Sequence, residues 1–165
     1  MWELFRSAVL VAATVAMGLM AGLFYAYACS VMIGLSRTDD RTFVDVMQRI
    51  NVAIINGWFA AIFVGAFALT TLAAVLHLRG DARPALPWIG AAFVLYVAAL
   101  AITFSVNVPL NNDLAAAGEP GRIADLAAVR EHFEARWVRW NIARAVACTA
   151  ALGCLAWALV LHGRK

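Results

Sequence analysis

One helical face near the end of the chain carries polar and aromatic side chains inside an apolar segment. In a helix, positions i, i+3, i+4 and i+7 lie on the same side. Here those positions hold Trp137, Trp140, Asn141 and Arg144. Arg144 belongs to the apolar run 142–161, where a guanidinium costs about 2.5–3.5 kcal/mol unless it faces protein or water. An intramembrane arginine therefore indicates a functional site, although a position near the interface or a structural pairing of two helices would explain it equally well.

Two other apolar segments carry amide side chains expected at the same membrane face. These are Gln48, Asn51 and Asn56 around the start of the second segment and Asn107 and Asn111 at the end of the third. In an antiparallel four-helix bundle, those ends lie beside the start of the fourth segment, which carries Arg144. We expect the amides, the cation and the indoles to line one pocket that holds a ligand. Gln48 is the outermost, and its position also suits a solvated helix surface.

The composition identifies an integral membrane protein. Of the 165 residues, 64% are hydrophobic and 14% are charged, which is too apolar for a soluble domain of this size. Four runs are long enough to cross a bilayer as helices. We predict an all-α fold in which residues 1–165 form a single membrane domain, a four-helix bundle. Its spans are expected at about 8–35, 54–78, 86–106 and 137–161.

Amphipathic lead-in helices are expected before the second and fourth spans. Ahead of the second span, helical spacing relates Phe43, Val46, Met47 and Ile50. Ahead of the fourth, residues 122–133 mix apolar and charged positions in the same way. At the end of the third span, Pro109 lacks an amide N–H and disfavours helical backbone at the residue before it. We therefore expect extended geometry at Val108 and the end of that helix.

The charges are scattered over the ends of the segments. A net charge of +3 without a basic patch argues against a nucleic-acid partner. The side that would hold both termini carries five basic and two acidic residues, and the other side carries eight of each. The positive-inside tendency places both termini of a multi-pass cell-membrane protein in the cytoplasm. The three cysteines match no zinc or redox spacing, so no metal site is expected.

The first span offers a close-packing surface and two aromatic anchors. Gly18 and Gly22 form a GxxxG within a stripe of small residues, which lets another helix approach closely. That neighbour is either a helix of the same chain or a second copy in a homo-oligomer. Tyr25 and Tyr27 are expected to anchor the helix at the interface, although either could line the pocket.

The polar blocks resemble the anthrone oxygenase-like family of small four-helix membrane proteins, many members of which are known only as a domain of unknown function. The resemblance extends over nearly the whole chain. Its blocks are residues 22–26, 31–35, 47–51, 106–111 and 137–144, of which the last two are the most specific. Relatives often carry a histidine directly after the Trp-Asn pair, where this chain has Ile142.

The resemblance implies a membrane-embedded oxidoreductase, a monooxygenase that oxidises an anthrone or another phenolic aromatic ring ketone with molecular oxygen and no cofactor. Such chemistry needs a base for an activated C–H proton and a cation or amides for the enolate oxygen. The oxyanion-binding candidates are Arg144, Asn107, Asn111 and Asn141. The candidates for contact with a small aromatic or lipophilic substrate are Trp137, Trp140, Asn51, Gln48 and Tyr25. His132 is the candidate base, with Asp113 as the alternative, although His132 also suits a solvated surface position.

Two other classes of function remain open. In a non-enzymatic membrane module, the polar cluster would lock helices together or bind a lipid or a partner protein. That class predicts direct side-chain pairs and no enclosed pocket. In a haem or metal protein, His77 and His162, at the same ends of the second and fourth spans, would be the axial ligands. Histidines at helix ends also serve as interfacial residues.

Overall fold

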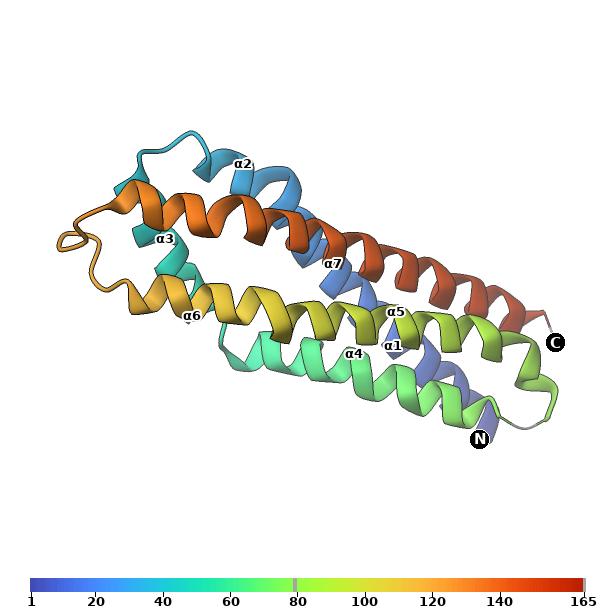
Figure 1. Ribbon diagram of the computed structural model, residues 1–165. Coiled ribbons are helices and arrows are strands. Elements are labelled where there is room, and N and C mark those ends of the chain that lie inside the picture. The colour runs from blue at the N-terminus through green and yellow to red at the C-terminus, as the bar shows by residue number, and fades with distance from the viewer. Residues whose placement is uncertain (79, 165) are drawn as a thin grey trace.

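The computed structural model describes residues 1–78 and 80–164, and every regular element within these ranges is helical. In chain order the elements are α1 (Trp2–Ala26), the π-helix η1 (Tyr27–Val31), α2 (Met32–Leu35), α3 (Asp40–Ala53), α4 (Gly57–Leu76), the 3₁₀-helix η2 (Gly80–Ala85), α5 (Leu86–Ile102), the π-helix η3 (Thr103–Asn107), α6 (Val108–Ala116) and α7 (Leu126–Gly163). They pack lengthwise as a four-helix bundle with both termini at one end (Figure 1). The predicted all-α membrane bundle is confirmed.

The four long helices differ in length, and the difference places part of the bundle outside the membrane. The helices long and apolar enough to span are Trp2–Leu35, Gly57–Leu76, Arg83–Ala116 and Leu126–Gly163. The second has 20 residues, about 30 Å of helix, which matches the hydrocarbon layer. The others have 34 to 38 residues and extend beyond it. Because α2, α3 and α6 lie at the end opposite the termini, the bundle projects from the membrane there (Figure 1).

Two clusters of buried side chains fill the bundle. The first runs between α1, α4, α5 and α7 and consists mainly of alanine, leucine and methionine side chains. The second, which we call the head cluster, lies at the projecting end and contains Met32, Leu35, Phe43, Val44, Met47, Leu110, Leu114, Phe133 and Trp137. Along α7, Trp137 is the member of the head cluster nearest to the membrane. The predicted functional face therefore begins where the two clusters meet.

The two amphipathic lead-ins are α3 and the first turns of α7. At the start of α3, the Asp39 carboxylate accepts a hydrogen bond from the Thr42 amide at 3.0 Å. The chain then turns at residues 54–56, which we call the elbow. α4 begins as a separate helix because the Asn56 side chain accepts from the Phe59 amide at 3.0 Å. The elbow lets α3 cover the end of the bundle while α4 enters the membrane.

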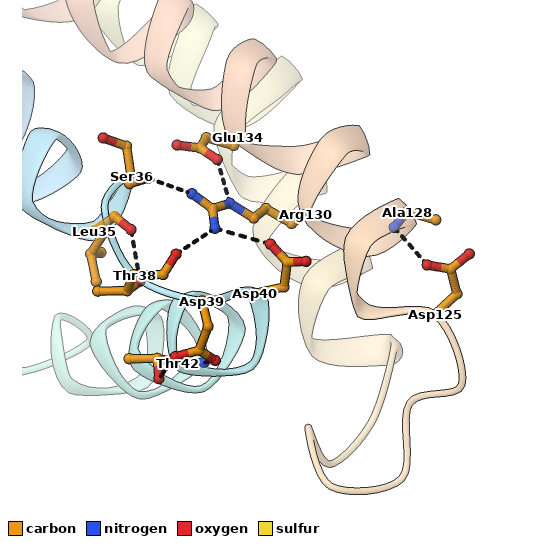
Figure 2. A network of polar contacts seen from close by, with 10 residues as sticks. All are labelled: Leu35, Ser36, Thr38, Asp39, Asp40, Thr42, Asp125, Ala128, Arg130 and Glu134. Atoms are coloured by element: carbon orange, nitrogen blue, oxygen red, sulfur yellow. Dashed lines mark hydrogen bonds and ion pairs between the residues drawn. The ribbon is translucent and has the colours of Figure 1, made fainter.

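Arg130, near the start of α7, holds the loop between α2 and α3 in place (Figure 2). Its guanidinium donates to the backbone carbonyls of Ser36 and Thr38 at 3.0 and 2.8 Å. It also donates to the carboxylates of Asp40 and Glu134 at 3.0 and 2.6 Å. One cation thus joins the end of α2, the start of α3 and the first turns of α7, which fixes the projecting ends of three helices relative to one another.

The expectation of extended backbone before Pro109 was wrong. Val108 is helical, with φ −65° and ψ −48°, and the helix continues from α5 through η3 and α6 to Ala116. Proline normally clashes with the carbonyl four residues earlier. Here the wider π turn of η3 lies immediately before Pro109 and makes room for its ring. The hydrogen bonding changes locally from the α-helical to the π-helical pattern, but the helix does not end. Asn107 and Asn111 therefore remain on one continuous helix.

The small-residue stripe of the first span packs partly within the chain. A Cβ atom at Gly18 would lie 3.6 Å from Cδ1 of Leu152, which belongs to α7. A Cβ atom at Gly22 would have no heavy atom within 4 Å. The Gly18 side of the stripe therefore contacts α7 of the same chain, and a homo-oligomer through the outer part, around Gly22, stays a prediction.

Candidate functional site

A cavity of about 310 Å³ lies where the head cluster meets the membrane part of the bundle. Its polar wall includes Asn51, Thr103, Asn107, Asn111, Asn112 and Arg144. Its aromatic wall consists of Phe24, Tyr27, Phe59, Phe63, Phe104 and Trp137. The exposed lining residues are Val52 and Ile55 on one side and Phe104, Asn112 and Ala115 on the other. The cavity therefore opens between the elbow and the η3–α6 helix.

Arg144 is a buried cation in the cavity wall, 5% exposed. Its Nη1 donates to Oγ1 of Thr103 at 3.3 Å and its Nη2 to Oδ1 of Asn141 at 3.0 Å. Its Cζ lies 4.4 Å from the ring centroid of Phe24 and 5.5 Å from that of Trp137. Among the described side chains, those of residues 1–78 and 83–164, no carboxylate lies within 4.0 Å of this guanidinium. The charge is surrounded by dipoles and rings, and no anion within the described chain balances it.

Three buried polar atoms around the cavity have no hydrogen-bond partner within the described chain. They are Nδ2 of Asn51, Oδ1 of Asn107 and Nε of Arg144. An unpaired buried donor or acceptor costs about 1–3 kcal/mol. Native structures contain few such atoms, and those that occur call for an explanation. Two donors and one acceptor from three helices around one cavity fit a polar ligand that completes the set.

Trp137 is held firmly against the helix that carries the two cavity asparagines. Its indole Nε1 donates to Oδ1 of Asn111 at 2.9 Å, and its backbone carbonyl accepts from Nδ2 of Asn107 at 3.3 Å. The indole is 5% exposed, and its ring centroid lies 5.8 Å from that of Tyr27. Asn111 therefore positions the indole and Asn107 the backbone of Trp137, and of these two asparagines only Asn107 keeps an unpaired oxygen acceptor.

The membrane side of the cavity is formed by phenylalanines. The rings of Phe59 and Phe63 are stacked at 5.1 Å, and Phe63 meets Phe104 edge to face at 6.0 Å. Such surfaces favour a flat apolar ligand. The cavity thus combines an aromatic floor with a polar wall that contains one cation.

Both π-helical turns found in the described residues, η1 and η3, lie beside this cavity. η1 contributes Tyr27, and η3 contributes Thr103, Phe104 and Asn107. A π turn inserts an extra residue into a helix, so it redirects the side chains that follow, and such turns are frequent at functional sites. The local widening of two helices is what places these four side chains in the wall.

Six of the ten predicted site residues line the cavity: Arg144, Asn107, Asn111, Trp137, Asn51 and Gln48. Gln48 also ties α3 to the end of α6, because its Nε2 donates to the carbonyls of Leu114 and Gly118 at 2.8 and 3.0 Å. Asn141 is buried behind Arg144 and does not line the cavity.

The other three predicted site residues lie elsewhere. Tyr25 is 61% exposed on the outer face of α1, and Trp140 is half-buried outside the cavity wall. His132 is exposed and lines a separate, smaller cavity between α6 and α7, with its Nε2 4.0 Å from Oδ2 of Asp113. Neither candidate base, His132 nor Asp113, therefore lines the cavity that contains Arg144.

The two histidines at the terminal end of the bundle contact each other directly. Nε2 of His77 lies 3.4 Å from Nδ1 of His162, and Nδ1 of His77 lies 2.7 Å from the carbonyl of Ala73. Nε2 of His162 lies 2.9 Å from Oγ of Ser7. With the rings in T-shaped contact at 5.2 Å between centroids, no space for a porphyrin plane separates them.

Comparison with protein-family models matches residues 57–154 to anthrone oxygenase, which is more than half of the chain. The chain belongs to the anthrone oxygenase family. The matched range covers α4 to most of α7 and includes Arg144, Asn107, Asn111 and Trp137, whereas η1 and α3 lie outside it. No curated protein and no solved structure matches the chain.

Proposed function

We propose that this protein binds a flat, lipophilic ring ketone of the anthrone type in the Arg144 cavity and oxidises it with molecular oxygen. The observation that carries the proposal is a buried guanidinium that lies beside a cavity and has no carboxylate near it within the described chain. The family match supports the same class of chemistry.

The charge of Arg144 supports binding of an anionic oxygen. A desolvated cation attracts an oxyanion far more strongly than a hydrated one does, because the surroundings screen the interaction less. When the CH₂ group across the central ring from the ketone loses a proton, the negative charge moves through the flanking aromatic rings to the ketone oxygen, which becomes the oxygen of an enolate. Arg144 would hold that oxygen, and the phenylalanine floor would take the rings. The cavity volume of about 310 Å³ is that of a small-molecule site.

The proposed reaction balances without a cofactor. The carbanion form of the enolate attacks O₂, forms a C–O bond and leaves the negative charge on the outer oxygen. Protonation gives a hydroperoxide, which loses its remaining C–H proton and hydroxide to form a C=O group. In sum, a CH₂ group and O₂ give a ketone and water. The carbon is oxidised, and O₂ is the only oxidant required.

A structural role for the same cluster is the competing proposal, and the pairs that Arg144 makes with Thr103 and Asn141 favour it. In that case the cluster joins α7 to η3 and α1, and the cavity binds lipid tails or nothing. The cavity itself supports the enzyme, because a purely structural cluster needs no open volume beside the cation.

The test uses the full-length protein in lipid nanodiscs, with anthrone as the probe and an oxygen electrode as the readout. Wild-type protein should consume one O₂ per anthrone, and Arg144→Ala should reduce the rate to the uncatalysed level while the protein still elutes as a folded species. Arg139→Ala, which removes an exposed arginine of the same helix, is the matched control and should keep wild-type turnover. Equal rates for wild type and Arg144→Ala would refute the proposal in favour of the structural role.

A further inference from the structure

We propose that Tyr27 is the proton-transfer residue of this cavity, donating a proton to the peroxide formed from substrate and O₂ and then removing the second C–H proton. This inference rests on the proposed oxygenase function and names the acid and base that the function lacks. Tyr27 lies outside the range matched by the family model.

The ionisable side chains of the cavity wall single out Tyr27 as the proton-transfer residue. Two proton transfers are needed for each ketone formed. Among the described residues that line the cavity, only Arg144 and Tyr27 have side chains that ionise. An arginine stays protonated and cannot serve as the base. Both His132 and Asp113 are exposed and line the smaller cavity instead. A phenol is therefore the remaining group of the wall that can give and take a proton.

The placement of Tyr27 supports this role. It is the first residue of η1, is half-buried, and its ring packs against the indole of Trp137 at 5.8 Å between centroids. Arg144 lies over the same indole, 5.5 Å from Cζ to the ring centroid. The phenol and the cation thus flank one aromatic side chain in the same wall, and a substrate held by Arg144 lies within the cavity that Tyr27 lines.

The hydroxyl of Tyr27 is not used for structure within the described chain. No described side chain or backbone group of residues 1–78 and 83–164 forms a hydrogen bond with it, whereas the buried Tyr96 donates its hydroxyl to the Phe63 carbonyl at 2.8 Å. Buried tyrosines usually find such a partner. The Tyr27 hydroxyl therefore remains available to a ligand in the cavity.

The steps conserve protons and electrons. Substrate binds to Arg144 as its enolate, and the first proton leaves to water. O₂ bonds to the carbanion carbon, and the resulting peroxide anion takes the proton of the Tyr27 hydroxyl. The Tyr27 phenolate, next to a cationic wall, then takes the remaining C–H proton. The C=O bond forms as the O–O bond breaks, hydroxide leaves, and hydroxide combines with the first proton as water, with Tyr27 protonated again.

The experiment compares Tyr27→Phe with Tyr25→Phe in nanodiscs with anthrone. Tyr25 lies two residues away on the opposite face, 61% exposed and outside the cavity wall, so it is a matched control. We expect Tyr27→Phe to bind anthrone with a dissociation constant within about twofold of wild type, measured by tryptophan quenching, and to lose about 100-fold or more in O₂ consumption. The little product formed should include free peroxide, detected by a peroxidase-coupled dye. Tyr25→Phe should match wild type, and Tyr27→His should recover part of the rate.

The outcomes distinguish the role of Tyr27 from the oxygenase function. If wild type consumes O₂ and Tyr27→Phe does so within about twofold of it, without peroxide release, the role of Tyr27 is overturned and the oxygenase function stands. If wild type consumes no O₂ above the uncatalysed rate, both are overturned. If Tyr27→Phe loses binding as well as turnover and Tyr27→His restores neither, Tyr27 shapes the site and does not transfer protons.

Discussion

Asn141 connects Arg144 to a neighbouring helix: its Oδ1 accepts from Nη2 of Arg144 at 3.0 Å, while its Nδ2 donates to the Phe24 carbonyl at 3.0 Å. The cation is thereby held by a neutral amide, which also supplies the N–H donor that the Phe24 carbonyl accepts. Asparagine at position 141 leaves the positive charge of the cavity unbalanced, and this neutrality can be tested directly.

Asn141→Asp should weaken anion binding at least tenfold without unfolding the protein. The new carboxylate would lie about 3 Å from the guanidinium and neutralise it, so an enolate would have to compete with an internal anion. We expect the affinity for anthrone to fall at least tenfold, measured by tryptophan quenching. Asn141→Leu removes the acceptor without adding charge, so it should cost about 1–3 kcal/mol of stability but retain more of the binding. Unchanged affinity in Asn141→Asp would show that the charge of Arg144 does not bind the ligand.

Arg130→Ala should destabilise the projecting end of the bundle. The change removes hydrogen bonds to Ser36, Thr38, Asp40 and Glu134. It also removes the cation stacked 4.6 Å from the Phe43 ring centroid. Charge-assisted hydrogen bonds of a side chain only 14% exposed contribute about 1.5–3 kcal/mol in such settings. We therefore expect a melting temperature several degrees lower by circular dichroism.

The control for Arg130 is Arg122→Ala. Arg122 pairs with Glu119 at 3.1 Å, but both side chains are more than 70% exposed, at 83% and 73%. Exposed pairs of this kind contribute little, so the melting temperature should not change. Equal effects of the two alanine substitutions would contradict the structural importance of the Arg130 network.

Protonation of Asp39 should loosen the start of α3 in acid. The Asp39 carboxylate accepts hydrogen bonds from the Thr42 hydroxyl at 2.6 Å and from the Thr42 amide at 3.0 Å. These hydrogen bonds hold the pKa of the Asp39 carboxyl below its usual 3.8. A lowered pKa contributes stability that is present above pH 3.8 and is lost as the pH falls through the lower, folded value. Asp39→Asn does not titrate. The wild-type advantage in melting temperature over Asp39→Asn should therefore be present at neutral pH and vanish in stronger acid, and a constant difference would contradict the cap.

Ile55→Trp should obstruct the mouth of the cavity. Ile55 belongs to the elbow, is 82% exposed and lines the cavity, so a larger side chain narrows the passage to η3 and α6. We expect KM for anthrone to rise several-fold with kcat little changed, because substrate entry slows and the chemical groups do not move. Val64→Trp, at a 61% exposed position of α4 outside the cavity wall, is the control. If both tryptophan variants behave alike, the mouth lies elsewhere.

The helical bundle and the convergence of its polar residues could be predicted from sequence because both follow from hydropathy and helical spacing. Apolar runs of spanning length specify the four helices, and antiparallel order alone brings Asn51, Asn107 and Arg144 to one membrane face. The lead-in before the second span was also predictable, because an amphipathic period in a membrane protein marks an interface.

Most of what the sequence did not reveal concerns which face of its helix a residue lies on. Positions i and i+2 differ by about 200° around a helix, so Tyr25 and Tyr27 cannot lie on the same face. The buried positions Met17, Met20 and Phe24 recur at spacings of three and four, and Tyr27 continues that series. This stripe was the signal that pointed to Tyr27. On α7, buried Trp137, Asn141, Arg144 and Cys148 follow the same spacing, which leaves Trp140 at the edge.

The π turns were not predictable from residue spacing. The effect of a proline on the preceding residue is a tendency, and at Pro109 the wider turn of η3 outweighs it and keeps Val108 helical. His132 and Asp113 were proposed as bases because they lie near the right depth along the chain. The structure turns both away, since α6 and the start of α7 pack their apolar faces, through Leu110 and Phe133, into the head cluster.

The unequal lengths of the four helices have a consequence for how both reactants arrive. The 20 residues of α4 begin, at Gly57, beside the cavity, so the mouth between the elbow and η3 is expected at the boundary of the hydrocarbon layer. Molecular oxygen and fused aromatic rings are both apolar solutes, and both concentrate in hydrocarbon relative to water. A cavity at this depth can take both O₂ and the aromatic substrate from the hydrocarbon layer. The water formed in the reaction can leave to the aqueous side through the end of the cavity that the asparagines line.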